Sequence, residues 1–151
     1  MEDEYFLEML ESAIKDAANS LLVTQSFQPF AQALKNDNSI MNFLSNDLDD
    51  DEAYIELSKR VQLEVENGDI KAIVLLQKSL LPQQFNMNIT QSIRVHIESK
   101  DNLHEKLGAR FLYVPYEEGN EQEGIKLFNP KPIAFSHEIF KGTSRNSSEC
   151  P

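Results

Sequence analysis

The stretch Ile93-Arg94-Val95-His96-Ile97-Glu98 decides the fold, because apolar and polar residues alternate strictly along it. Successive side chains of a β-strand point to opposite faces, so a period of two predicts a strand with one buried and one solvated face. We expect the strand to cover residues 89–99. Its polar residues Arg94, His96 and Glu98 are then expected to form a solvated row of alternating charge.

Further strands are predicted on both sides of this one. Short apolar runs, separated by Asn, Asp, Gly or Pro, occur at residues 27–34, 40–44, 70–76, 109–114, 125–128 and 133–140. These separating residues favour turns, and connectors of hairpin length favour antiparallel pairing. Pro29 cannot donate a ladder hydrogen bond, so the first of these strands is predicted to begin at it or to lie on a sheet edge.

Two other segments show the period of a helix. In residues 4–23, apolar residues recur in adjacent pairs every four positions, which makes one apolar stripe. A second helix is predicted from about Asp51 to Asn67, because aspartates can cap its start and Gly68 can end it. Its inward residues are predicted to be Ala53, Tyr54, Leu57, Val61 and Val65.

The predicted order of elements is therefore α-β-β-α-β-β-β, with room for one more strand. An antiparallel sheet of about five to six strands with both helices packed on one face would bury both apolar stripes, which is an α+β architecture. We expect residues 1–140 to form this single domain. Residues 141–151 are rich in polar residues and are expected to form a flexible tail.

The charge of the chain is strongly uneven. The 151 residues include 14 basic and 25 acidic ones, for a net charge of −11. Residues 1–58 hold two basic and thirteen acidic residues, so the whole excess lies there. This balance argues against nucleic acid and anionic membrane surfaces as partners. No apolar run reaches the ~18–20 residues of a membrane span, and the acidic N-terminus is unlike a secretory signal or transit peptide.

Charge asymmetry of this kind indicates an interaction surface for a basic protein. The candidate partner-binding residues are all acidic: Glu8, Glu11, Asp47, Asp49, Asp50, Asp51 and Glu52. The alternative interpretation is that these residues form two solvated helix faces and one loop that keep the protein in solution.

An alternative pocket is suggested by the histidine of the central strand. His96 and Glu98 are two residues apart on a strand and share a face, so the carboxylate can orient or charge the imidazole, as a general base requires. Tyr113 and Tyr116 lie near the end of another predicted strand and can line a pocket with them. This alternative is a small enzyme or a ligand-binding domain.

Metal and cofactor signatures are absent or incomplete. Asp47, Asp49 and Asp51 alternate like the start of a calcium loop, but Glu52 stands where the glycine is needed and Ser58 where the bidentate glutamate is needed. A helix cap is therefore expected there. Phosphate-binding glycine motifs do not occur, and we expect no metal and no cofactor. The single cysteine, Cys150, cannot staple the fold, and the simplest compartment is the cytoplasm.

Three short stretches carry a family resemblance. The run Phe27, Pro29, Phe30 and Ala31, the stretch 93–98, and Val114-Pro115-Tyr116 together resemble small uncharacterised bacterial α+β proteins over residues 4–140. Some proteins of this kind are immunity proteins, which bind and neutralise a toxin made by the same cell. The order of elements also resembles the profilin-like layout. The resemblance implies no catalytic residues.

The leading hypothesis is a non-catalytic, cytoplasmic protein-binding domain, in its most concrete form an immunity-type protein that binds a basic partner through its acidic N-terminal portion. The enzyme or ligand-binding domain is the alternative. A homodimeric scaffold, built by an edge strand or by the first helix, is the second alternative.

Overall fold

The computed structural model describes residues 4–45, 50–100, 108–118, 124–136 and 138–140. Two helices and seven strands occur in these ranges: α1 (Glu4–Thr24), β1 (Phe30–Lys35), β2 (Ile40–Leu44), α2 (Asp50–Glu66), β3 (Ile70–Leu80), β4 (Gln91–Ser99), β5 (Ala109–Glu118), β6 (Ile125–Leu127) and β7 (Lys131–Phe135). The predicted tail, residues 141–151, lies outside the described residues, as do Asp47 and Asp49.

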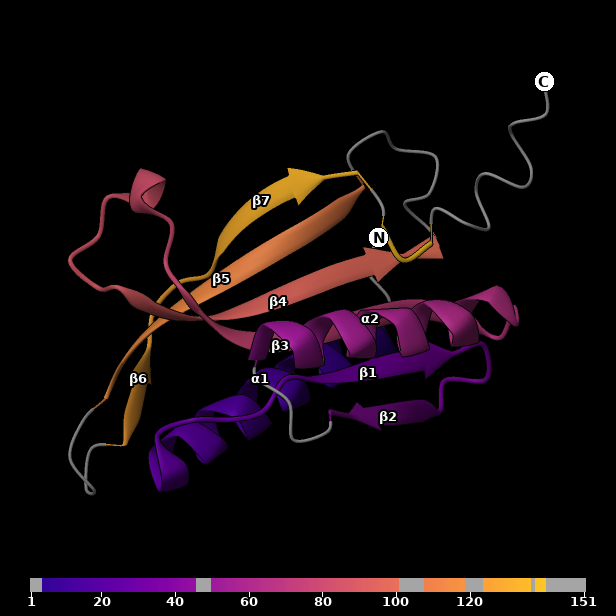
Figure 1. The fold of residues 1–151 in the computed structure, drawn as a ribbon, viewed down its shortest axis with the longest axis horizontal. Helices are drawn as coiled ribbons and strands as arrows, with labels where there is room; N and C mark the ends of the chain where they lie inside the picture. The colour runs from indigo at the N-terminus through magenta and orange to yellow at the C-terminus, as the bar shows by residue number, and fades with distance from the viewer. Residues whose placement is uncertain (1–3, 46–49, 101–107, 119–123, 137, 141–151) are drawn as a thin grey trace.

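The strands form one antiparallel sheet in the order β2-β1-β3-β4-β5-β6, and β7 also pairs with β5 (Figure 1). This confirms the predicted α+β class, the antiparallel sheet and the order of the elements. The sheet has seven strands, one more than the upper end of the expected number. The extra strand arises because β6 and β7 pair with different parts of β5.

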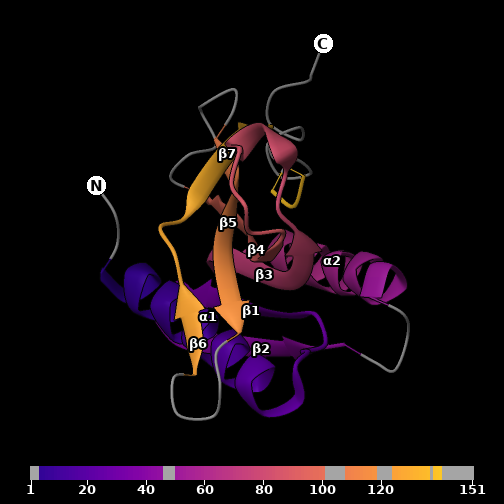
Figure 2. The ribbon, with the colours of Figure 1, turned by 90° about the vertical axis from the view of Figure 1, so that its left-hand side faces the viewer.

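The two helices cover opposite faces of the sheet, so the prediction that both pack on one face is wrong. The buried stripe of α1 packs in one apolar cluster with Val74, Leu76 and Val95. The buried residues of α2 pack in a second cluster with Ile73 and Leu75. Figure 2 shows α1 and α2 on different sides of the central strands.

The burial of strand β3 explains why the two helices lie on opposite faces of the sheet. Residues 72–76 are all buried, and they alternate between the α1 cluster and the α2 cluster. A strand that is buried on both faces shows a continuous apolar run instead of an alternating one. The run at residues 70–76 is such a signal, and it requires a layer of cover on each side.

The connection between β1 and β2 is a tight hairpin. Asn38 takes the left-handed conformation with φ 72°, which asparagine tolerates better than most residues. The Lys35 amide donates to the Ser39 carbonyl at 2.9 Å, and the Asp37 carboxylate accepts from the Ser39 amide at 3.0 Å. The polar turn predicted at residues 35–39 is therefore present, and β1 begins directly after Pro29.

The segment predicted as a strand at residues 133–140 is only partly one. β7 ends at Phe135, and residues 138–140 form bends. Ile139 and Phe140 are buried in the cluster under α2. Their backbone amides bind a side chain of β4 instead of a neighbouring strand, as described below. Neither α1 nor α2 has the length and apolar character that a bilayer-crossing helix requires.

Candidate functional site

The polar row of β4 is buried, so the prediction of a solvated face is wrong. His96 is 1% exposed and Glu98 is 0% exposed. The ring of His96 makes edge contacts with Phe111 and Phe135, with ring centroids 5.3 and 5.1 Å away. Tyr54 of α2 covers the same face. A buried polar group must be hydrogen-bonded to be tolerated, and each of these side chains has such partners.

A chain of hydrogen bonds joins α2 to β4. The Tyr54 hydroxyl lies 2.9 Å from His96 Nδ1, and His96 Nε2 lies 2.5 Å from Glu98 Oε2. A carboxylate only accepts hydrogen bonds, so Nε2 carries a proton and donates to Glu98. The second hydrogen bond joins Nδ1 to the Tyr54 hydroxyl, and the protonation of the ring sets its direction. Each side chain in this chain orients the next.

The Glu98 carboxylate lies in a cradle of backbone amides. The amides of Glu138, Ile139 and Phe140 donate to its two oxygens at 3.0 to 3.1 Å. Successive backbone N–H groups of this kind form an anion-binding nest. Burial by itself raises the pKa of Glu98, but the hydrogen bond and charge of His96 and these backbone amides outweigh it and hold the pKa below its ordinary value. The glutamate is therefore a buried anion that fixes residues 138–140 on the sheet.

Arg94 extends the same network at the other end of the row. Its guanidinium donates to Gln77 Oε1 at 2.6 Å. It also lies over the rings of Tyr54 and Phe111, 4.9 and 4.7 Å from their centroids. Cation–π contacts of this kind stabilise a partly buried guanidinium. The whole polar row is thus covered by aromatic rings.

The order hydroxyl, imidazole, carboxylate is also the order of groups in nucleophilic triads. Two observations argue against that use here. Burial raises the pKa of Tyr54, which keeps its hydroxyl protonated. The Glu98 carboxylate already accepts from three backbone amides in addition to His96. The geometry therefore favours a structural role for Tyr54, His96 and Glu98.

The two tyrosines of the alternative pocket are not brought together. Tyr113 lies directly opposite Arg94 across the β4–β5 ladder and therefore shares its face, on the α2 side. Tyr116 belongs to the cluster under α1 on the other face. The sequence did not single out the true partners of His96 and Glu98, which are Tyr54 and the backbone of residues 138–140. The apolar pair Ile139 and Phe140 was the signal that this segment is buried.

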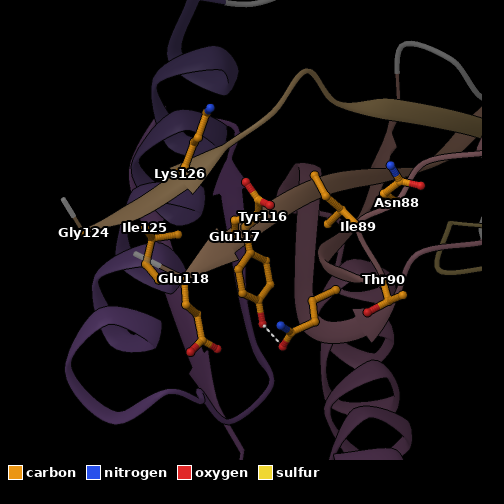
Figure 3. Close-up of a pocket in the computed structure, with 10 residues that line it drawn as sticks. Asn88, Ile89, Thr90, Tyr116, Glu117, Glu118, Gly124, Ile125 and Lys126 are labelled. Atoms are coloured by element: carbon orange, nitrogen blue, oxygen red, sulfur yellow. Dashed lines mark hydrogen bonds between the residues drawn. The ribbon is translucent and has the colours of Figure 1, made fainter. Parts of the chain in front are cut away.

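Tyr116 instead borders an open hollow of about 890 Å³ (Figure 3). The hollow lies where the start of β4 separates from the β5–β6 hairpin, and it is lined by Asn88, Thr90, Tyr116, Glu118 and other residues. The Tyr116 hydroxyl donates to Gln91 Oε1 at 3.1 Å, and burial raises its pKa to about 12. Of the four predicted pocket residues, only Tyr116 lines this hollow.

The candidate acidic residues are divided between two helices. Glu8 and Glu11 are exposed on α1, and Asp51 and Glu52 are exposed at the start of α2. Because α1 and α2 cover opposite faces, these residues do not form one surface. Asp47 and Asp49 lie outside the described residues, and the side chain of Asp50 is not described either. Among the residues with described positions, no group of three His, Cys, Asp or Glu can hold a metal ion.

The fold and this network define an α+β protein in which a seven-stranded antiparallel sheet lies between two helices. Comparison with known proteins finds no family model, no curated protein and no solved structure that matches the chain.

We expect Tyr54→Phe to lower the free energy of unfolding by about 1–3 kcal/mol, because it leaves the buried Nδ1 of His96 without its hydrogen-bond partner. Chemical denaturation measures this loss. Tyr113→Phe is the matched control, since the Tyr113 hydroxyl forms no hydrogen bond with another described residue. Equal losses for the two variants would show that the Tyr54–His96 bond contributes nothing specific.

Proposed function

We propose that the protein is a non-catalytic protein-binding domain and that the outer face of α1 binds a basic protein. The supporting observation is that the acidic side chains on this helix are exposed and are not neutralised by ion pairs within the described part of the chain. Glu4, Glu8, Glu11 and Asp16 are all exposed, and none of them forms an ion pair with another described residue. The one basic residue of the helix is Lys15.

The outer face of α2 is less suited to this role. Its acids are accompanied by bases, and Glu56 lies 3.8 Å from Arg60 in an ion pair one turn along the helix. Charges that are neutralised within one helix contribute little to long-range attraction. The four acids of α1, defined here as the acidic face, therefore carry the proposal, and they include Glu8 and Glu11 from the sequence analysis.

The buried network supports the non-catalytic part of the proposal. The one histidine–carboxylate pair in the described residues is enclosed and fully hydrogen-bonded. An immunity-type protein in the cytoplasm is the concrete form that we favour, because a basic toxin would match the acidic face in charge. The net charge of −11 also argues against nucleic acid as the partner.

The test is association kinetics with a captured partner. The full chain is first cross-linked to proteins of its own cell lysate with a carbodiimide, which joins carboxylates to lysines in contact. The captured basic protein is then purified and its association rate is measured. We expect the rate to fall about tenfold or more between low and high salt, and to fall similarly when Glu4, Glu8, Glu11 and Asp16 are changed to their amides.

The matched control changes four exposed or partly exposed acids of α2, which are Asp51, Glu56, Glu64 and Glu66, to their amides. It alters the net charge equally and leaves α1 intact. The proposal fails if the two variants slow association to the same extent, or if cross-links do not reach the acidic face.

A further inference from the structure

The two edges of the sheet differ in how they are protected. An open edge strand invites pairing with another chain, and proteins usually block it with lysine, proline or a very short strand. At one edge β6 has three residues and contains Lys126, and β7 contains Lys131 and Pro132. At the other edge β2 has the five residues Ile40-Met41-Asn42-Phe43-Leu44, with none of these features.

The backbone of β2 presents hydrogen-bonding groups to its outer edge. Lys35 and Ser39 close the hairpin with an amide-to-carbonyl bond, so the hydrogen-bonded pairs of the β1–β2 ladder fall at Met41 and Phe43. In an antiparallel ladder the residues between such pairs direct their backbone groups the other way. The outer edge is therefore formed by Ile40, Asn42 and Leu44, and the Leu44 carbonyl also accepts from the Arg60 guanidinium of α2. In the described residues β1 is the only strand that pairs with β2.

The side chains of this outer edge are self-complementary. If two β2 strands pair antiparallel about Asn42, each Ile40 lies opposite a Leu44 of the other copy, and the two Asn42 residues face each other. Ile40 is 45% exposed and Leu44 is 73% exposed in the single chain, so the pairing would bury both. In the same register the two Asn42 residues form a hydrogen-bonded pair of the ladder, which matches the outward direction of their backbone groups.

The absence of charge on β2 and two unsatisfied polar atoms beside it also favour a second copy of the chain as the partner of this edge. Two copies of a chain with net charge −11 repel each other least where the contacting patches are uncharged, and β2 contains no charged residue. A groove of about 480 Å³ runs between the end of α1 and β2 and is lined by Phe30, Gln32, Asn42, Leu44, Ser45 and others. Gln32 Oε1 and Ser45 Oγ are buried there without a hydrogen-bond partner.

We propose that two copies of the chain form a dimer by antiparallel pairing of β2 about Asn42, which extends each seven-stranded sheet into one continuous sheet. The side chains that β2 contributes to this interface are apolar or amide, so a second copy fits the strand better than a charged partner does. Of the acidic face of α1, only Asp16 lines the groove beside β2, and Glu4, Glu8 and Glu11 are not among its lining residues. The dimer and the proposed binding function can therefore fail independently.

The test is the mass of the full chain in solution, measured by light scattering after size-exclusion chromatography over a wide range of concentration. We expect twice the chain mass of 17.3 kDa. The double variant Ile40→Lys, Leu44→Lys places lysines opposite each other across the proposed axis and should halve the mass. The control Ile55→Lys, Leu63→Lys adds the same charge at exposed apolar residues of α2 and should leave the mass unchanged.

A cysteine at the proposed axis gives a second readout that does not depend on weakening the fold. In a Cys150→Ser background, Asn42→Cys should form a covalent dimer on mild oxidation, because paired strands bring the two Cα atoms within disulfide range. Leu63→Cys in the same background should not. A chain that has the mass of a monomer at every concentration would overturn the proposal, as would a dimer that persists in the β2 lysine variant or is lost in the α2 control.

Discussion

Replacing Glu98 by glutamine is expected to lower the free energy of unfolding by about 3–5 kcal/mol. Glutamine has nearly the same shape, but its amide group brings hydrogen-bond donors to a place that already holds donors. His96 Nε2 and the amides of residues 138–140 all point at the carboxylate. At least one of these buried donors loses its acceptor, and the anion that attracts them is gone. Urea denaturation with a two-state fit measures the change.

Glu117→Gln is the matched control for this variant, because Glu117 is an exposed glutamate on the neighbouring strand β5. It should change the stability by no more than about 0.5 kcal/mol. Similar losses in the two variants would mean that the amide nest does not stabilise the protein.

The same glutamate predicts a dependence of stability on pH. Its pKa in the folded protein is held below the ordinary value, which is about 4.3 for a free glutamate. The folded state therefore binds fewer protons than the unfolded state in this range. The stabilisation is fully present above about pH 4.3 and is lost as the pH falls through the folded pKa. The difference in stability between the wild type and Glu98→Gln that this carboxylate contributes should hold down to about pH 4.3 and shrink below it. A constant difference would contradict the pKa shift.

Leu75→Ala and Leu76→Ala are each expected to lower the free energy of unfolding by about 2–5 kcal/mol. These neighbouring residues of β3 point to opposite faces, and both are 0% exposed. Leu75 packs under α2 and Leu76 packs under α1, so each truncation leaves a cavity in a different cluster. Thermal or chemical denaturation of the two variants provides the measurement.

Leu80→Ala is the control on the same strand, because Leu80 is 76% exposed and its loss should cost no more than about 0.5 kcal/mol. This set of variants separates the two arrangements of the helices. If both helices covered one face, one of the two neighbouring leucines would face solvent and its variant would resemble the control.

Much of the fold could be predicted because secondary structure has a local signature. One residue of each apolar pair of α1 is buried, as are the inward residues Ala53, Leu57, Val61 and Val65 of α2, whereas Tyr5 and Leu22 of the predicted stripe are exposed. The turn at residues 35–39 and the strand start after Pro29 are also where the turn-forming residues place them. These features depend on the period of the apolar residues and on backbone preferences of single residues, which are readable along the chain.

The candidate site was harder to predict, because its parts are far apart in the sequence. Alternation at residues 93–98 correctly indicates two different faces, but it cannot say what covers the polar one. Tyr54 precedes His96 by 42 residues, and Ile139 follows Glu98 by 41. A row of polar residues on a strand is predicted to face solvent unless other parts of the chain supply buried hydrogen-bond donors and acceptors for it. Here α2 and residues 138–140 supply them.

The sequence by itself therefore determined which segments are helices and strands, that the strands pair antiparallel, and that the excess of acidic over basic residues lies in the first 58 positions. Only the tertiary structure decided that α1 and α2 lie on opposite faces. An apolar stripe on a helix shows that the helix packs against the sheet, but it does not show against which face of the sheet it packs. That choice buried His96 and Glu98, divided the acidic residues between two surfaces, and left β2 as the open edge of the sheet.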